Sequence, residues 1–591
     1  MCGIAGIWGE GGDIRRMTRL LTHRGPDEEG FHETGPVRLG SRRLIVIDPQ
    51  GGRQPMRSSD GALALVFNGL VFNYRELRGE LESLGHTFRS AADTEVVLHA
   101  YEAWGEDCLQ RFNGMFALAV HDGRRIWLAR DRMGEKPLYY HLDGSRLRFA
   151  SETKALLPGM DVAPEFDEAA IVFETAIGDR TLYRDIRSLE PGHTLSWDGE
   201  RLEIKRYWAL PRGGEAEQRT EDQYVEELRW LIEDAVRIRL RSDVPLGAFL
   251  SGGLDSSLIT CLARPDTVFS CRFPNGETYD ESRYAALVAR QIGARHRVVQ
   301  PGPRTFREYY PRVLHHLDQP AATASSIAEF SLAALASREV KVVLGGQGAD
   351  ELFGGYVRYL LMLEEQRLGS RPELLNYHAL ARWFWGAGLF DTPWRRYFHL
   401  IRRAEPEGRA AGEAVRRHFE RHRHVIDAMG ACDIAISLPP LIRMNDRAAS
   451  AFGLENRTPF LDHRIVEFAF RLPPDLKVRE LTSKYILRRA ARGIVPDEII
   501  DRRDKLGLVV PVSRWFDGEL RPWAEALDRD FRRRELAAPL LRRQPPGGRG
   551  EFDRSLYHRI STELWLREVV DGAPVESLGR GAAEDLLSTC R

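Results

Sequence analysis

The sequence predicts two folded parts of different class: an α+β part with stacked antiparallel sheets and helices, followed by an α/β part with a parallel sheet and a large helical portion. Up to about residue 208, short alternating strand patterns are interrupted by helical ones. The segment LPRGGEAEQRTED (residues 210–222) is polar, contains glycine and has no apolar period. Beyond it, strand and helix patterns alternate, which is typical of parallel sheets built from βαβ units.

The domain boundaries follow from this change of pattern. A length of 591 residues exceeds what one hydrophobic core usually serves. We expect a first domain over residues 2–210, a linker over 211–224, a second domain over 225–575 and a C-terminal tail over 576–591.

The first part is expected to contain β-hairpins. Asp-Gly pairs stand between apolar runs at Asp122-Gly123, Asp143-Gly144 and Asp198-Gly199. This pair favours type I′ turns, because both central residues need a positive φ. The expected strands lie within residues 37–48, 62–73, 115–131, 137–151 and 193–204, and the expected helices within 74–85 and 94–109.

The second part alternates strands and helices. The expected strands lie within residues 244–250, 267–273, 296–300 and 340–344, and the expected helices within 256–263 and 280–294. This order predicts a parallel sheet with crossover helices.

The composition excludes several classes of function. Lys and Arg total 85 against 86 Asp and Glu, so no overall field attracts the chain to nucleic acid or to an anionic membrane. No stretch approaches the roughly 20 apolar residues that a membrane helix needs, and the N-terminus lacks the pattern of a signal peptide. The six cysteines are sparse and have no CxxC spacing, which favours a reducing compartment. We expect a cytoplasmic protein that acts on small molecules.

Cys2 is the first candidate for catalysis. It follows Met1 directly and is small enough for that methionine to be removed, which leaves a cysteine with a free α-amino group. Such an amine titrates near 7.7–8.0, so it can accept the thiol proton and later protonate a leaving amine. From its position alone, Cys2 could equally be a small apolar residue that opens a strand.

The residues around Cys2 favour catalysis. The chain carries MCGIAGI, HRGPD, RRLIVID, FNG, RDRMGEKPLYY and FASETKAL in its first 156 residues. Through these motifs it resembles the class II glutamine amidotransferases, whose nucleophile is the N-terminal residue. The resemblance implies that Cys2 is the nucleophile, that Arg43 and Asp93 hold the α-carboxylate and α-amino group of glutamine, and that Asn68 and the Gly69 N–H form the oxyanion hole. An Arg fork suits a carboxylate, and Asp is a natural counter-charge for an ammonium group.

A second candidate site lies at AFLSGGLDSSLIT. Residues 251–257 (SGGLDSS) follow an apolar strand and begin a helix. Glycines allow backbone N–H groups to approach phosphates, and the helix N-terminus adds partial positive charge. No GKS or GKT follows, so this is not a Walker A loop.

The loop resembles the pyrophosphate loop of ATP pyrophosphatases. Further motifs are similar to those of the asparagine synthetase family: YDESRYA, DQP, LGGQGADELFGGY, DRAASAFGLENRTPFLDHR, SKYILRRA and RDKLGLVVPVSRWF. The resemblance implies the following ATP-binding residues: Leu250, Ser251, Gly252, Gly253, Asp255, Ser256, Ser257, Cys271, Gly345 and Gly346. It also implies that Asp255 and Asp350 bind Mg²⁺, whose ligands are hard oxygens. Lys484 would stabilise charge during amide formation, unless it is a surface helix residue.

Two residues depart from the family pattern. Leu70 follows the Asn-Gly pair where a Glu that contacts glutamine is usual, and Gln347 stands where many asparagine synthetases have a Glu that assists adenylation. Gln347 is therefore a further catalytic candidate. Neither Leu nor Gln carries a negative charge.

The predicted function is glutamine-dependent amidation of a carboxylate through an acyl-adenylate, with aspartate as the expected acceptor, and with ATP and Mg²⁺ required. The alternatives are the same reaction on another carboxylic acid, such as a natural product, an ATP-dependent cyclase, and a non-catalytic homologue. The resemblance leaves a homodimer open. His418 and His422 are spaced for zinc, but an exposed basic helix face is the favoured interpretation.

Overall fold

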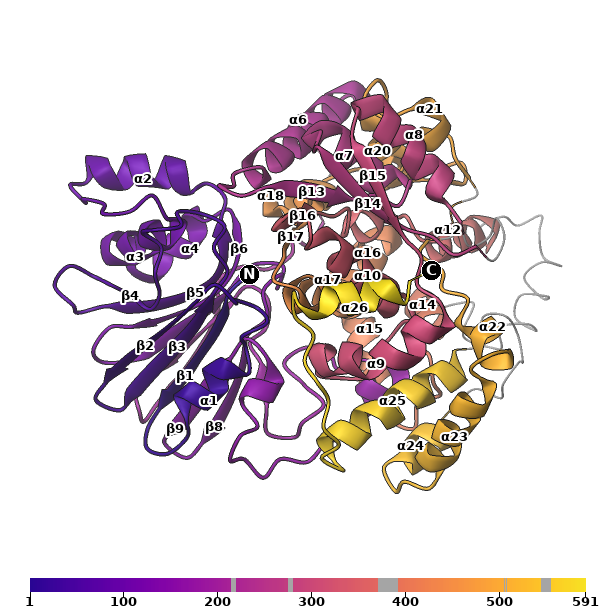
Figure 1. Cartoon of the computed structure of the whole chain (residues 1–591). Coiled ribbons are helices and arrows are strands. Elements are labelled where there is room, and N and C mark those ends of the chain that lie inside the picture. The colour runs from indigo at the N-terminus through magenta and orange to yellow at the C-terminus, as the bar shows by residue number, and fades with distance from the viewer. Residues whose placement is uncertain are drawn as a thin grey trace.

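The computed structural model describes residues 1–213, 219–274, 280–369, 392–503, 505, 507–543 and 554–590. Residues 214–218 of the expected linker, and Tyr279 of the YDESRYA motif, lie outside the described residues. Figure 1 shows the N-terminal part, with its broad sheets, lying beside a larger body in which many helices surround a smaller sheet.

The N-terminal part contains two six-stranded antiparallel sheets. The first has the order β10-β8-β9-β1-β3-β2, with β10 (Arg187–Ser188), β8 (Tyr139–Asp143), β9 (Arg146–Ala150), β1 (Gly3–Trp8), β3 (Val37–Arg43) and β2 (Glu28–Thr34). The second has the order β12-β11-β7-β6-β5-β4, with β12 (Leu202–Arg206), β11 (His193–Trp197), β7 (Ile126–Arg130), β6 (Gly114–His121), β5 (Ala64–Val71) and β4 (Met56–Arg57).

The two sheets stack face to face. Apolar side chains of β1, β3 and β9 pack in one core against those of β5, β6, β7 and β11. The other face of the second sheet packs against α2 and α3, and that of the first sheet against α1. The helices of this part are α1 (Ile14–Arg19), α2 (Tyr74–Ser83), α3 (Asp93–Trp104), α4 (Cys108–Arg111) and α5 (Glu168–Phe173), with the short 3₁₀ turns η1 (Gly105–Asp107) and η2 (Thr153–Ala155). The predicted α+β class is confirmed.

The three hairpins form where they were predicted, joining β6 to β7, β8 to β9 and β11 to β12. The predicted turn type is wrong. The glycines have positive φ values of 81°, 57° and 102°, but the aspartates before them do not. Two of these aspartates bind the turn backbone instead: Asp122 Oδ1 accepts hydrogen bonds from the N–H groups of Arg124 and Arg125, and Asp198 Oδ1 binds its own turn in the same way.

The C-terminal part is built on a five-stranded parallel sheet of order β15-β14-β13-β16-β17. The strands are β15 (Arg295–Val299), β14 (Thr267–Cys271), β13 (Leu246–Phe249), β16 (Val342–Leu344) and β17 (Glu455–Arg457). Four of them coincide with predicted strands, so the predicted α/β class is confirmed. A small hairpin, β18 (Val478–Arg479) with β19 (Thr482–Ser483), lies outside this sheet.

Helices pack on both faces of this sheet, and further helices form a large helical portion beyond it (Figure 1). They are α6 (Glu221–Arg239), α7 (Leu254–Ala263), α8 (Ser282–Ile292), α9 (Pro303–Leu317), α10 (Ser325–Ala336), α11 (Ala349–Phe353), α12 (Val357–Gly369), α14 (Pro393–Ile401), α15 (Ala410–Arg421), α16 (Val425–Ile436), α17 (Leu438–Ala451), η4 (Pro459–Leu461), α18 (His463–Ala469), α19 (Pro474–Lys477), α20 (Tyr485–Ala491), α21 (Asp497–Ile500), α22 (Val512–Asp517), α23 (Arg521–Arg532), α24 (Ala537–Arg542), α25 (Ser555–Val569) and α26 (Ala582–Ser588).

Two helical segments differ from simple expectations. Val425–Ala451, which covers α16 and α17, is long and apolar enough to cross a membrane, contrary to the sequence-based expectation that no stretch comes near that length. Because 61% of its most apolar stretch is buried inside the protein, it has the character of a core helix. Within residues 576–590, helix α26 buries Ala583 and Leu586 against the core around α10.

A buried ionic network joins the two parts. The guanidinium of Arg24, on the N-terminal part, lies 2.8 Å from Glu152 Oε1 and 2.9 Å from Asp446 Oδ2 of α17. Arg447 of the same helix also pairs with Glu152. Burial opposes the charge of Glu152, but Arg447, His23 and Lys154 outweigh it and hold the pKa of this carboxyl well below its usual range. The network therefore fixes the N-terminal part against α17.

Candidate active sites

The first candidate site surrounds Cys2, immediately before the central strand β1. Because β3 is antiparallel to β1, with Gly3 opposite Arg42, the end of β3 brings Arg43 next to Cys2. The cavity at Cys2 is also lined by Gly69, Leu70 and Asp93. The structure thus brings together in one cavity residues that are far apart in the sequence.

Arg43 and Asp93 are held by their surroundings. The guanidinium of Arg43 donates to Glu28 Oε2 at 2.8 Å and to the carbonyl oxygens of Ile47 and Asp48 at 3.0 and 2.6 Å. Asp93 is the first residue of α3, where its Oδ2 accepts from Val71 N at 3.3 Å. Burial raises the pKa of Asp93 to about 7, and nearby Glu455 adds to this effect.

Asn68 and Gly69 are neighbours on β5; Gly69 lines the same cavity, whereas Asn68 is not among its lining residues. The Asn68 side chain is fully buried, and neither its Nδ2 nor its Oδ1 has a hydrogen-bond partner. A buried amide without partners is costly unless a ligand binds it. Gly69 has a φ of 145°, and a Cβ there would overlap the Met115 carbonyl oxygen of β6, so sheet packing alone also requires this glycine.

Ionisation at Cys2 is dominated by burial. Burial raises the pKa of the Cys2 thiol, while the N-terminal ammonium group and Arg43 partly oppose it. With Met1 present, burial lowers the pKa of the N-terminal amine to about 6, although Glu455, whose Oε2 is 3.9 Å away, favours the charged form. This amine is that of Met1; the nitrogen of Cys2 is an amide until Met1 is removed, and only then is a free amine present on Cys2.

The second candidate site lies at the carboxyl edge of the parallel sheet. Leu250, Cys271 and Gly345-Gly346 follow or end the neighbouring strands β13, β14 and β16, so they meet at one edge. Leu250 N donates to Phe269 O at 2.9 Å, which aligns the first two of these strand ends. This is the position where open α/β sheets bind ligands.

The loop between β13 and α7 is closed by its serines. Ser251 Oγ lies 3.0 Å from Ser256 Oγ, whose oxygen also accepts from Ser251 N at 3.2 Å. Gly252 has a φ of 73°. A Cβ on Gly346 would lie 2.8 Å from Ser256 N, so glycine at 346 lets the two loops touch.

Lys484, Asp255 and Asp350 form the charged centre of this site. Lys484 Nζ lies 2.6 Å from Asp255 Oδ2 and 2.7 Å from Asp350 Oδ1. Burial opposes the charge on Lys484, but the two carboxylates outweigh it and raise the pKa of its ammonium group. Lys484 is buried, which excludes the alternative that it is a surface helix residue. Asp255 Oδ1 is buried without a partner.

Gln347 lies near Asn456, the middle residue of β17. Its Oε1 is buried without a partner, and so is Oδ1 of Asn456. A Cβ on Gly345 would overlap Gln347 Oε1 and lie 3.3 Å from Asn456 Oδ1, so both oxygens are near Gly345. A small cavity next to Asn456 is lined by Glu135 and Lys136 of the N-terminal part.

Sequence reasoning missed three residues of these sites. Glu455, from β17, lines the Cys2 cavity although it lies far along the chain. Lys505 lies beside the loop of residues 251–257, which we call the phosphate-type loop, because a Cβ on Gly253 would come within 2.7 Å of the Lys505 side chain. Lys505 pairs at 2.6 Å with Glu281, which belongs to the YDESRYA motif. Lys505 and Glu281 belong to two motifs more than 200 residues apart, and the sequence carries no signal that pairs their charges.

Two larger cavities lie where the helical portion meets the N-terminal part. One, of about 440 Å³, is lined from both parts and includes His418. The other, of about 270 Å³, is lined by Tyr356 and by four arginines: Arg358, Arg403, Arg443 and Arg554. The two cavities share a wall in which Arg443 donates to Gln319. The exposed basic helix face expected around His418 and His422 holds for Arg417 and Arg421, which are exposed, and not for His422, which is buried.

Comparisons with known proteins cover both parts of the chain. A family model described as asparagine synthase matches residues 227–567, and one described as glutamine amidotransferase domain matches residues 1–208. Asparagine synthetase [glutamine-hydrolyzing] 1 of Bacillus subtilis is 32% identical over 570 residues, covering 88% of this chain and 89% of that protein.

Two further relatives extend the comparison. A putative asparagine synthetase [glutamine-hydrolyzing] of Mycobacterium bovis is 33% identical, covering 89% of this chain and 90% of that protein. Amidase chry2 of Gibberella zeae is 28% identical, covering 86% of each. Proteins with differing names therefore resemble this chain over most of its length.

Proposed function

This chain belongs to the asparagine synthase family, and we propose that it uses ATP and glutamine to convert a carboxylate into an amide, with aspartate as the acceptor. The observation that carries the proposal is that one chain holds a Cys2 cavity with Arg43 and Asp93 and a phosphate-type loop with Lys484, and that strand β17 reaches both, with Glu455 lining the Cys2 cavity and Asn456 beside Gly345. Glutamate, AMP and pyrophosphate would be the other products.

The first half-reaction would take place at Cys2. After removal of Met1, the α-amine would accept the thiol proton while the sulfur attacks the side-chain amide carbon of glutamine, giving a thioester and ammonia. The unpartnered Nδ2 of Asn68 and the Gly69 N–H would bind the developing oxyanion. Arg43 and Asp93 would hold the α-carboxylate and the α-ammonium group. Water would then release glutamate.

The second half-reaction would take place at the loop 251–257. The acceptor carboxylate would attack the α-phosphate of ATP, forming an acyl-adenylate and releasing pyrophosphate. Asp255 and Asp350 suit Mg²⁺, because Asp255 Oδ1 is buried without a partner and both carboxylates face the same point. When bound, Mg²⁺ would neutralise charge on the pyrophosphate. Lys484 would stabilise the charge that develops when ammonia attacks the adenylate.

Ammonia would pass through the interface between the two sites. Ammonium in water is not a nucleophile, so an enclosed route preserves the reactive form. Asn445 and Asn456 line the small cavity at this interface, and their Oδ1 atoms, like Oε1 of the nearby Gln347, are buried acceptors without partners. They could each accept a hydrogen bond from ammonia, and Glu455 and Lys136 lie at the Cys2 end.

The cavity lined by four arginines is our candidate for the acceptor. Burial, together with Arg554 and Arg358 nearby, lowers the pKa of Arg403, while Glu174, which lines the same cavity, opposes this shift. Arg358 is itself paired with Asp433 at 2.8 Å, so the excess of positive charge in the cavity lies mainly at Arg403, Arg443 and Arg554. An anionic acceptor would relieve this charge. The cavity adjoins the second site, since Tyr356 follows Gly355, which packs against Asp350 and Lys484.

The size of this cavity supports a second candidate function. About 270 Å³ approaches the roughly 300 Å³ at which pockets for drug-sized ligands begin, and the neighbouring cavity of about 440 Å³ lies behind one shared wall. An acceptor acid larger than aspartate therefore remains the alternative, with the same mechanism.

Acceptor-dependent pyrophosphate release tests the proposal. The purified chain would be given ATP, Mg²⁺ and glutamine with aspartate, glutamate or larger carboxylic acids, and the amide product identified by mass spectrometry. Asparagine as the product supports aspartate. Release with another acid alone favours the alternative, and absence of release with every acid contradicts an amidating enzyme.

A further inference from the structure

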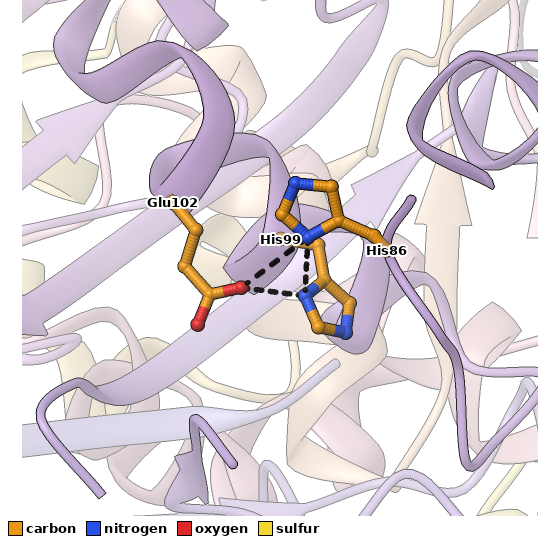
Figure 2. Close-up of side chains that lie close together, drawn as sticks. All are labelled: His86, His99 and Glu102. Atoms are coloured by element: carbon orange, nitrogen blue, oxygen red, sulfur yellow. Dashed lines mark hydrogen bonds and ion pairs between the residues drawn. The ribbon is translucent and has the colours of Figure 1, made fainter. Parts of the chain in front are cut away.

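A cluster of two histidines and a glutamate lies on the N-terminal part, away from both candidate sites. Figure 2 shows His86, His99 and Glu102 pointing toward one another. His86 Nδ1 is 3.2 Å from His99 Nδ1, which is 2.6 Å from Glu102 Oε2, and the third edge, from His86 Nδ1 to Glu102 Oε2, measures 3.6 Å. Within the described ranges, no other group of three or more His, Cys, Asp or Glu residues brings its ligand atoms this close.

Hydrogen bonds among the two Nδ1 atoms and Glu102 Oε2 do not readily satisfy all three atoms at once. Nδ1 of a neutral histidine carries either a proton or a lone pair. If His99 Nδ1 is protonated and donates to Glu102, it has no lone pair to accept a hydrogen bond from His86. If it is not protonated, its lone pair faces a carboxylate oxygen at 2.6 Å. A single proton on His99 Nδ1 would have to be shared between Glu102 and His86 to serve both short edges, whereas a cation at the centre would bind all three lone pairs.

We propose that His86, His99 and Glu102 bind one divalent transition-metal ion of the zinc type. Two imidazoles and a carboxylate are ligands that Zn²⁺ favours, and a tetrahedral ion with Zn–N bonds of about 2.0–2.1 Å has ligand atoms about 3.3 Å apart. The two edges to His86, 3.2 and 3.6 Å, lie close to this value, and the 2.6 Å edge between His99 Nδ1 and Glu102 Oε2 would lengthen when the ion binds. The side chains of His86, His99 and Glu102 keep 22%, 11% and 25% of their exposure, so an ion can enter and water can supply a fourth ligand.

The surroundings of His99 fit this assignment. With Nδ1 on the metal, Nε2 carries the proton and faces Glu95 Oε1, which is 3.8 Å away. Metal-bound histidines commonly direct their second N–H to a carboxylate, which fixes the ring. Glu95 is itself held by Arg89 N at 2.9 Å and by Ser90 N at 2.7 Å.

The ion would cross-link the segment after α2, which carries His86, to α3, which carries His99 and Glu102. His86 begins this segment, whose Ser90 binds Glu95 and whose Ala91 N donates to Asp48 Oδ2 at 2.7 Å. The carbonyl of Asp48 accepts from Arg43, which lines the Cys2 cavity. The consequence rests on the proposed function. By holding this segment in place, the metal would keep Arg43 positioned to bind the α-carboxylate of glutamine, and so lower the KM for glutamine.

Titration of the full chain with ZnCl₂ tests the site. After treatment with a chelator, we expect calorimetry to find one Zn²⁺ per chain, and Co²⁺ to give the visible absorption of a tetrahedral ion. His86→Gln and Glu102→Gln should each weaken zinc binding by about tenfold or more. The matched control is His32→Gln, because His32 and His121 form another pair, with ring centroids 6.4 Å apart.

The outcomes separate the metal site from the glutaminase. Zinc binding that is unchanged in His86→Gln and Glu102→Gln, or that is lost equally in His32→Gln, overturns the site. If the site is correct, adding Zn²⁺ should lower the KM for glutamine by about fivefold in the wild type and not in His86→Gln. An unchanged KM overturns the coupling. A chain that binds zinc but never hydrolyses glutamine contradicts the proposed function and leaves the metal assignment intact.

Discussion

The Nζ atom of Lys484 lies 2.6 Å from Oδ2 of Asp255, so the residue before α20 supplies the counter-charge for the second residue of helix α7. Lys484 is buried and Asp255 is partly buried. Removing either one leaves an uncompensated charge, which is costly in a protein interior.

Replacing Lys484 by Gln should lower the rate of amide formation by about 100-fold or more, because a preorganised charge at the reacting centre is lost. The measurement is kcat for AMP formation with saturating ammonium. Lys505→Gln is the matched control, since Lys505 also approaches the loop but is exposed and pairs with Glu281. We expect that variant to raise the KM for ATP and to keep most of kcat. Near wild-type kcat in Lys484→Gln would contradict the role.

Replacing Cys2 by Ala should abolish glutamine-dependent synthesis and leave synthesis from ammonium, because the second site does not use the thiol. Glutamate release and amide formation are measured separately with each nitrogen source. Chain that retains Met1 should also fail to hydrolyse glutamine, since the amine that acts as base is then an amide. Normal hydrolysis by Met1-containing protein, verified by intact mass, would refute the self-base mechanism.

Glutamine use should depend on the ionisation of Asp93. Its pKa of about 7 means that the carboxyl is neutral below pH 7 and charged above it. Only the charged form attracts the α-ammonium group of glutamine, so kcat/KM for glutamine should fall as the pH is lowered through about 7. In Asp93→Asn the value should be low at every pH. A kcat/KM that stays constant between pH 8 and pH 6 contradicts this prediction.

Much of the fold could be predicted from sequence because strand periodicity and Asp-Gly pairs are local signals. The four inner and edge strands β13 to β16 coincide with apolar runs. β17 could not be predicted, because Glu455–Arg457 is only three residues long and has no period. It is nevertheless the strand that brings Glu455 to the Cys2 cavity and Asn456 to the second site.

The candidate sites could be predicted where residues lie inside recognisable motifs, and their geometry could not. Cys2, Arg43 and Asp93 do meet in one cavity, while their chemical roles remain predictions. Contacts between the two parts, such as Arg24 with Asp446, depend on packing between segments hundreds of residues apart, for which local sequence has no signal. The hairpin turns show the same limit, since Asp122 binds the backbone instead of adopting a positive φ.

Asn456→Leu should uncouple the two half-reactions. The variant removes a buried acceptor between the sites and fills its space with an apolar side chain of similar size. Glutamate release should persist, while the ratio of glutamate to AMP rises above one. Synthesis from added ammonium serves as the internal control and should change less. A ratio that stays at one would show that ammonia does not depend on this position.

Gln347 provides the sharpest test of the acceptor. Its Oε1 is buried without a partner beside Gly345, where a carboxylate oxygen would fit the same space. If aspartate is the acceptor, wild-type protein should release pyrophosphate with ATP, Mg²⁺ and aspartate, and Gln347→Glu should preserve or raise that rate. If the acceptor is another acid, aspartate gives little release, and the added negative charge should repel the incoming carboxylate and slow the reaction. Gln347→Leu controls for loss of the polar atom. We expect release with aspartate. Its absence over a wide concentration range, together with activity on a different acid, would overturn aspartate as the acceptor and leave the amidation mechanism standing.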